Sequence, residues 1–222
     1  MKDFKKAMKM YIRISYHPLM VILMLLIIGG ISIAMMVDPA EISDKGYIEK
    51  ISAVGMIHGM LLMLFFLGNS RMASSKCFSS LPQAKSLFTD VPIVAIGTLC
   101  IGTDIVIFIA ALLMSGKDVA ADFLIVDSIN TVLVCFLNVM MYKYRDKAAA
   151  LFMWLILFSE FEQIFWLGKI SALKHGFGLG IPAAALIAVA IYVVGIAAIR
   201  ILAQHWWKSS SRNFVQPIKN LS

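Results

Sequence analysis

Charged residues are scarce in this sequence of 222 residues, where Asp, Glu, Lys and Arg together make up only 15%. Typical soluble domains carry about a quarter of their residues as charged side chains. Here 60% of the residues are hydrophobic instead. This composition excludes an ordinary soluble domain and indicates a membrane protein, since a membrane span needs about 20 mostly apolar residues.

Cysteines and catalytic motifs are also lacking. Cys77, Cys100 and Cys135 are the only cysteines, and their placement predicts neither a disulfide framework nor a metal site. Because there is no GxxxxGK[ST] loop, the chain itself cannot hydrolyse ATP by that route. There is also no HExxH motif, no GxGD motif of intramembrane proteases and no spaced aspartates of CDP-alcohol transferases. We therefore expect that the chain is not an enzyme and binds no metal or cofactor.

The apolar residues are grouped into six long stretches. We predict a transmembrane helix in each, because a helix satisfies its own backbone polar groups in lipid, whereas a barrel would show short alternating segments. The predicted spans are residues 18–37, 51–68, 92–114, 122–142, 148–167 and 179–203. The connections are short, so residues 1–222 are expected to form a single all-α membrane domain.

Positive charge is distributed unevenly between the two sides of this predicted bundle. Fifteen of the 20 Lys and Arg residues fall on the side of the termini, and five fall in the loops opposite. By the positive-inside rule, both termini are cytoplasmic in a multi-pass protein of the plasma membrane. Contact with anionic lipid then accounts for the net charge of +7, and no nucleic-acid partner is expected.

Both ends of the chain have features of a membrane interface. Residues 1–17 are predicted to form an amphipathic helix lying in the interface, the alternative being a frayed basic flank of the first span. Residues 204–222 are predicted to form a cytoplasmic tail, with Trp206 and Trp207 in the interfacial aromatic belt. The row that follows helical spacing on the side away from the lysines consists of Phe4, Ala7, Met8, Tyr11, Ile12 and Ser15.

The stretch FSSLPQAKSLFTDVP, between the second and third predicted spans, has the start and stop signals of a short helix. Ser80 is placed to cap its first turn, with Gln83 completing a capping box. Pro82 is tolerated in the first turn, and Pro92 is expected to end the helix.

One face of this short helix is apolar, because Ala84, Leu87 and Phe88 follow helical spacing. A helix of about ten residues is not stable alone, so it must rest on something. In one interpretation it rests on lipid headgroups. In the other it docks into a groove on another protein, with Leu87 and Phe88 as anchors.

The segment SSKCFSSLPQAKSLFTDVP resembles the permease subunits of ABC transporters of the ABC-2 type. In that family, a segment beginning with LP in this loop forms the coupling helix. Six spans, cytoplasmic termini, a basic amphipathic N-terminal helix and a short fifth span with re-entrant outer helices are further family features. The arginine that often follows LP is replaced here by Gln83, Ala84 and Lys85.

The resemblance implies a separate ATPase subunit that binds ATP and Mg²⁺, and a pathway formed in the lipid membrane with a second copy or a homologous permease. It implies export of a small amphipathic or antimicrobial-type peptide, or of a hydrophobic drug or lipid. The alternative is an ATP-independent channel or structural membrane protein, and copurification of an ATPase distinguishes the two. The implied coupling residues are Ser80, Leu81, Pro82, Gln83, Ala84, Lys85, Leu87, Phe88 and Asp90.

A few polar side chains interrupt the predicted spans. Acids in lipid cost about 2.5–3.5 kcal/mol each, so they are expected to face protein or water. In one interpretation they line the exit of the pathway and favour cationic or amphipathic cargo. In the other, Asp104 and Asp127 bond to neighbouring helices or stay protonated, and the polar residues of the fifth span mark where it breaks into a re-entrant outer hairpin. His58 is expected to be a hydrogen-bonded core residue rather than a ligand. The candidate pathway residues are Asp104, Asp127, Glu160, Glu162 and Gln163.

Overall fold

The computed structural model describes residues 2–15, 76–114, 116–143 and 177–209, together with residues 22, 26, 30, 57–59, 61, 62, 65, 68, 69 and 72. Within these residues all regular structure is helical and no strand occurs, which confirms the predicted all-α class. In chain order the helices are α1 (Lys2–Ser15), α4 (Lys76–Ser79), α5 (Ala84–Phe88), α6 (Asp90–Met114), α7 (Lys117–Lys143) and α10 (Ile181–Ser209).

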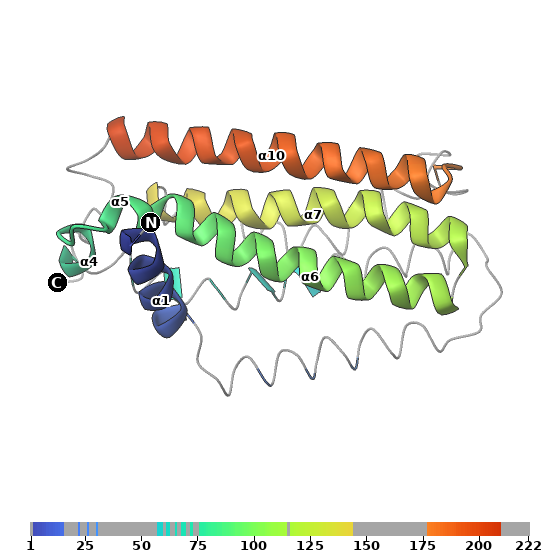
Figure 1. Cartoon of the computed structure of the whole chain (residues 1–222), viewed down its shortest axis with the longest axis horizontal. Coiled ribbons are helices and arrows are strands. Elements are labelled where there is room, and N and C mark those ends of the chain that lie inside the picture. Colours follow the sequence, from blue (N-terminus) through green and yellow to red (C-terminus); the bar gives the residue numbers. More distant parts are fainter. Residues whose placement is uncertain are drawn as a thin grey trace, which may run out of the picture.

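The long helices α6, α7 and α10 run side by side and form the body of the described structure (Figure 1). Three helical segments are long and apolar enough to cross a membrane, with 30, 27 and 28 residues. At a rise of about 1.5 Å per residue, each exceeds a hydrocarbon core of about 30 Å. These segments are Ala84–Leu113, Lys117–Lys143 and Ile181–Lys208.

These three segments coincide with the third, fourth and sixth predicted spans, as expected of a membrane protein. The predicted spans over residues 18–37 and 51–68 are described only at isolated positions. The span predicted over residues 148–167 lies outside the described residues. A total of six spans therefore stays a prediction.

The helix ends differ from the predicted ones in the loop before α6. Ser80 does not cap α5, because its hydroxyl donates to the Cys77 carbonyl oxygen (2.9 Å) at the end of α4. Gln83 precedes α5 without a side-chain capping bond, so the predicted capping box is wrong. Pro92 does not end a helix either, since it lies in the first turn of α6. The backbone N–H groups of a first turn have no partner within the helix, so the missing N–H of proline costs no helical hydrogen bond there.

The connection between α6 and α7 is tight, since α6 ends at Met114 and α7 begins at Lys117. Gly116 has a φ of +95°, a backbone conformation that residues with a side chain seldom adopt. Its N–H donates to the Ala111 carbonyl oxygen (3.1 Å) and so closes the end of α6. This turn brings α7 back along α6.

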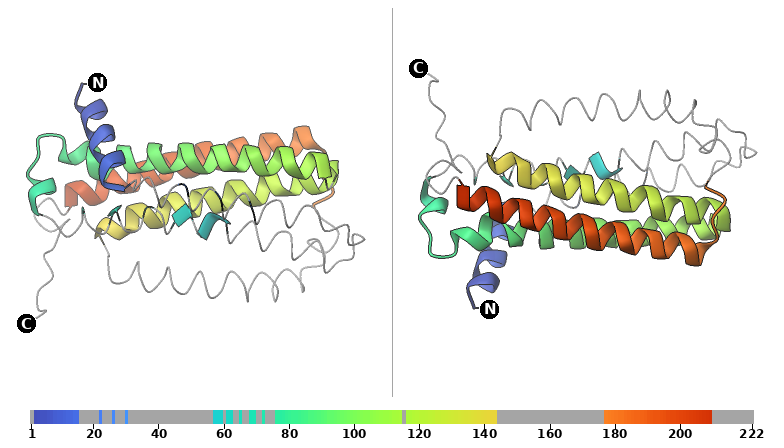
Figure 2. Two further views of the ribbon diagram at one scale, coloured as in Figure 1. Left: turned by 90° about the horizontal axis from the view of Figure 1, so that it is seen from below. Right: turned by 90° about the horizontal axis from the view of Figure 1, so that it is seen from above.

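Helix α10 lies closely against α7 (Figure 2). The side of α10 that faces the bundle is built from small residues, including Ala184, Ala188 and Ala203, all of which are buried. A Cβ atom added at Gly195 would lie 2.6 Å from a methyl carbon of Val132, so the two backbones approach at a distance that only glycine permits. The last turns of α10 include residues 204–209, which were predicted to belong to the tail.

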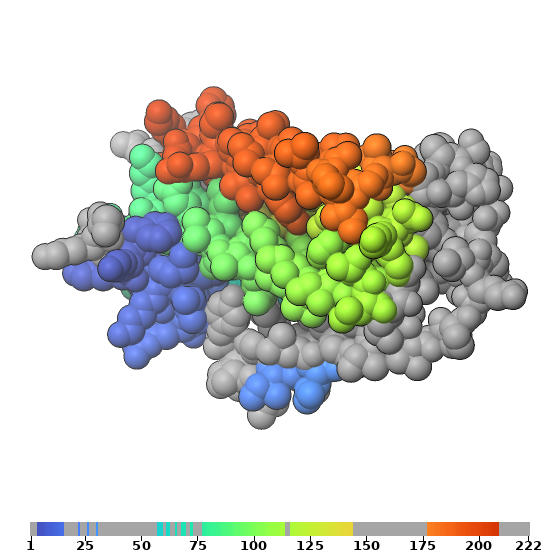
Figure 3. Space-filling model, turned by 45° about the vertical axis from the view of Figure 1, so that its right-hand side comes forward, coloured from blue at the N-terminus to red at the C-terminus, as the bar shows by residue number. Residues whose placement is uncertain are grey.

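The outer side of α10 is apolar and exposed within the described structure, where the helix forms a ridge on the bundle (Figure 3). Exposed aliphatic side chains of this kind suit contact with lipid or with another membrane helix. They include Leu186, Val189, Val193, Val194 and Ile201.

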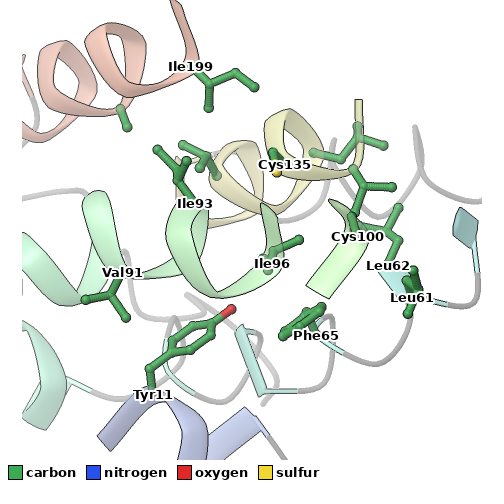
Figure 4. Packing of buried hydrophobic residues seen from close by; sticks show 14 of the residues in the cluster. Tyr11, Leu61, Leu62, Phe65, Val91, Ile93, Ile96, Cys100, Cys135 and Ile199 are labelled. Atoms are coloured by element: carbon green, nitrogen blue, oxygen red, sulfur yellow. The ribbon is translucent and has the colours of Figure 1, made fainter. Parts of the chain in front are cut away.

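Helix α1 lies across the end of the bundle at which α6 begins and α10 finishes (Figure 1). The helix itself was predicted, and Ala7, Tyr11 and Ser15 of its predicted row are buried. Tyr11 extends into the core beside Phe65, with ring centroids 6.3 Å apart (Figure 4). A Cβ atom at Gly68 would lie 2.5 Å from the Ser15 Cα, so Gly68 allows α1 to approach. The position of α1 in a membrane interface stays a prediction.

Candidate functional site

The first candidate site is the loop unit, defined as residues 76–90, which contains α4 and α5. Its apolar face was identified correctly, because Ala84, Leu87 and Phe88 are all buried. The expectation that Leu87 and Phe88 anchor in a partner's groove is wrong, because both have 0% exposure within this chain and belong to its own core. The sequence predicted that this apolar face is buried against another surface. It did not predict that α1 and the spans of the same chain form that surface.

Phe88 joins the loop unit to the ends of two long helices. Its ring meets the Tyr142 ring of α7 edge-on, at a centroid distance of 5.0 Å and an interplanar angle of 85°. It also stacks with the Trp207 ring of α10 at 6.1 Å. Aromatic pairs in such arrangements contribute about 0.5–1.5 kcal/mol beyond their buried area. Trp207, which was expected in an interfacial belt, thus also holds α5 in place.

Polar contacts fix the joint between α5 and α6. The Thr89 hydroxyl is buried and donates to the Lys85 carbonyl oxygen (2.7 Å), which ends α5. At the first residue of α6, an Asp90 oxygen accepts from Nε of Arg200 in α10 at 2.7 Å. The Arg200 side chain is 62% exposed, so this pair adds little stability, but it links α10 to the joint.

The opposite face of the loop unit is open to solvent. Lys85 and Pro82 are exposed, and both lie at or just before α5. A soluble partner would therefore contact these side chains rather than the apolar face. Among the predicted coupling residues, Ser80, Pro82 and Lys85 are exposed, Leu81, Gln83 and Asp90 are partly exposed, and Ala84, Leu87 and Phe88 are buried.

A network around Asn69 lies buried near the same end of the bundle. The hydroxyls of Tyr11 and Tyr142 both donate to the Asn69 Oδ1 atom, at 2.9 and 2.7 Å. The Asn69 Nδ2 atom donates to Oδ1 of Asn138, whose own Nδ2 donates to the Val134 carbonyl oxygen. These residues, here called the Asn69 network, tie α1 to α7. Sequence reasoning missed it, although asparagine in an apolar stretch is a signal for such a contact.

The second candidate site is a polar cluster in the middle of the bundle, consisting of His58, Asp104, Asp127, Thr131 and Tyr192. The Asp104 carboxylate is at its centre and is buried. Its Oδ1 atom lies 2.8 Å from Nε2 of His58. Its Oδ2 atom accepts hydrogen bonds from the hydroxyls of Thr131 (2.7 Å) and Tyr192 (2.6 Å). Asp104 therefore bonds to neighbouring segments, one of the two interpretations that the sequence left open.

His58 is buried and hydrogen-bonded, as predicted. Asp127, also within the cluster, has 0% exposure, and neither of its oxygens has a hydrogen-bond partner in the described structure. Ligand atoms of His58, Asp104 and Asp127 all lie within 4.8 Å of one another. An imidazole and two carboxylates this close can exchange a proton or hold a cation.

The other predicted pathway residues, Glu160, Glu162 and Gln163, lie outside the described residues. Their grouping with Asp104 and Asp127 along an exit pathway stays a prediction. The inclusion of His58 in the cluster was not predicted, because residues 58, 104 and 127 are far apart in the sequence.

No protein-family model, no curated protein and no solved structure matches this chain.

Proposed function

We propose that this chain is the membrane subunit of a transporter driven by a separate ATPase, with the loop unit as the element that receives the motion of the ATPase. One observation carries this proposal. The short helix α5 is held to α1, α6, α7 and α10 through one face, and its other face is exposed. A coupling element needs this arrangement, since one face must contact a partner and the other must move the spans.

The attachment of α5 to the bundle is firm for so short a helix. A helix of 5 residues has no stability of its own, so tertiary contacts set its position. Full burial of Leu87 and Phe88 contributes about 1.5–3 kcal/mol for each side chain. A displacement of α5 must therefore carry the ends of α7 and α10 with it or expose both side chains.

The distribution of charge supports a cytoplasmic position for the loop unit. Helix α1 alone contributes five basic residues at this end of the bundle. Among the residues that the structure describes, Lys117 is the only basic residue at the opposite end. By the positive-inside rule, α1 and the loop unit then face the cytoplasm, where an ATPase would be found.

The remaining parts of the proposal follow from the resemblance to ABC-2 permeases. The partner ATPase binds ATP and Mg²⁺, and a second copy or a homologous permease completes the pathway. The apolar outer side of α10 is available for lipid or for that second permease. Transport is export across the plasma membrane, with small amphipathic peptides as first candidates and hydrophobic drugs or lipids next.

Purification of the tagged chain from its native membranes tests this proposal. The wild-type chain should copurify with a subunit that has a P-loop and hydrolyses ATP. The double change Pro82→Glu, Lys85→Glu alters only exposed side chains and should reduce the bound ATPase about tenfold, which corresponds to about 1.4 kcal/mol. The control Lys117→Glu, at the other end of the bundle, should leave it unchanged.

Absence of any P-loop subunit from the wild-type preparation would contradict the proposal and favour an ATP-independent channel or structural protein. Equal ATPase retention by the double variant and the control would remove the coupling role from the loop unit.

A further inference from the structure

Three side chains with metal-binding atoms converge inside the bundle. They are His58, Asp104 of α6 and Asp127 of α7, and all three are buried. Each offers one ligand atom, and these atoms lie within 4.8 Å of one another. They come from separate segments of the chain and meet at one place.

Asp127 gives an independent reason to expect a ligand. Its carboxylate is completely buried, and neither oxygen has a hydrogen-bond partner in the described structure. The hydroxyl of the adjacent Ser128 donates instead to the Ile125 carbonyl oxygen (2.7 Å). A buried carboxylate with no donor is costly, and a bound cation would remove this cost.

We propose that His58, Asp104 and Asp127 form a binding site for one divalent transition-metal cation such as Zn²⁺ or Mn²⁺. Imidazole nitrogen and carboxylate oxygen are ligands that such ions accept, and two carboxylates balance a charge of +2. The set contains no thiolate or thioether, the ligands that Cu⁺ prefers. This site does not depend on the function proposed above.

The Asp104 carboxylate is held in an orientation that suits metal binding. Nε2 of His58 and Oδ1 of Asp104 are 2.8 Å apart, a separation that two atoms bound to one ion at about 2.0–2.2 Å can have. Thr131 and Tyr192 donate to the other oxygen of Asp104 and fix the orientation of the carboxylate. Removal of a hydrogen bond that orients a metal-binding side chain commonly lowers metal affinity about 10–100-fold.

Binding through His58 replaces its hydrogen bond to Asp104. The imidazole proton must then sit on Nδ1, and any proton that His58, Asp104 or Asp127 carries on a ligand atom in the absence of metal is released to solvent when the metal binds. Asp127 completes the set by a small approach of its carboxylate. The cluster therefore needs local adjustment only, and no movement of α6 along α7.

The test uses the purified full-length chain in lipid nanodiscs, treated with EDTA and then titrated with Zn²⁺ or Co²⁺. The wild type should bind one equivalent, show Co²⁺ absorption bands of a protein-bound ion, and unfold at a higher temperature when metal is present. Asp127→Asn should raise the Kd at least about tenfold. The matched control is Asp122→Asn, which removes a carboxylate from the same helix outside the cluster and should leave the Kd unchanged.

A folding defect cannot imitate this result. Asp127→Asn removes a buried group that lacks a donor, so without metal the variant should unfold at the same temperature as the wild type or at a higher one. Only the wild type and Asp122→Asn should then gain thermal stability from metal. The proposal is overturned if metal does not stabilise the wild type, or if it stabilises Asp127→Asn equally.

Discussion

The Asn69 network and the polar cluster are both buried polar groups, but they differ in completeness. In the network, neutral amides and hydroxyls use one another as donors and acceptors around the Asn69 Oδ1 atom. In the cluster, Asp104 accepts three contacts while Asp127 has none from the described residues. A fully satisfied buried network rigidifies the helices that it joins, whereas an unpaired buried polar group is costly. We therefore expect the loop end of the bundle to be rigid, and the proposed metal ion to complete the cluster in its middle.

The loop end should be the more sensitive of the two regions to truncation. Phe88→Ala removes the ring that contacts both Tyr142 and Trp207, and Phe→Ala changes in cores cost about 3–5 kcal/mol. The free energy of unfolding, measured by denaturant titration in detergent micelles, should fall by this amount. An effect below about 1 kcal/mol would mean that α5 is not fixed to the bundle.

Removal of Asn69 should have the next largest effect. Asn69→Ala removes the acceptor that the hydroxyls of Tyr11 and Tyr142 share and the donor to the Oδ1 atom of Asn138. Loss of a hydrogen bond by a buried group costs about 1–3 kcal/mol. We expect a loss of about 3 kcal/mol in the same titration. Asn130→Ala is the control, since its Nδ2 atom is already unpaired in the described structure and its loss should cost far less.

Tyr192→Phe should lower both the stability of the protein and its affinity for metal. It removes one of the hydrogen bonds to Asp104, with an expected cost of about 1–2 kcal/mol in unfolding free energy. Because Tyr192 positions the Asp104 carboxylate, Zn²⁺ affinity should fall as well. Tyr142→Phe removes a hydroxyl from the Asn69 network and should lower stability without changing Zn²⁺ affinity. Equal Zn²⁺ affinities of the two variants would contradict a positioning role for Tyr192.

The smallest effect on stability is expected at Asp127. In the absence of metal, Asp127→Asn should leave the free energy of unfolding unchanged or increase it, since no described hydrogen bond is lost. A loss above about 2 kcal/mol would show that the carboxylate has a structural partner and would make the polar cluster as complete as the Asn69 network.

The sequence was most informative for long apolar segments. Residues 92–114, 122–142 and 179–203 were identified because continuous hydrophobicity over about 20 residues has few explanations other than a span. Their ends were less accurate, since flanking polar residues such as Lys117 and Lys208 continue the helices without adding to the apolar signal. The apolar face of α5 was found from its spacing, but spacing does not identify the surface that covers it.

The polar sites were harder to predict for a different reason. Asp104 and Asp127 were visible as acids within spans, yet their partners depend on how α6, α7 and α10 pack together. His58 joins the cluster through tertiary structure alone. Asn69 gave only the weak signal of an amide in an apolar stretch.

Photo-crosslinking from position 85 would show whether the exposed face of α5 contacts a separate ATPase. A photo-reactive amino acid is placed at position 85, and at position 117 as a control, and cells are irradiated before purification. We expect a crosslink to a P-loop ATPase from position 85 and none from position 117. Crosslinks from position 85 to lipid alone, with no ATPase captured at either position, would contradict it.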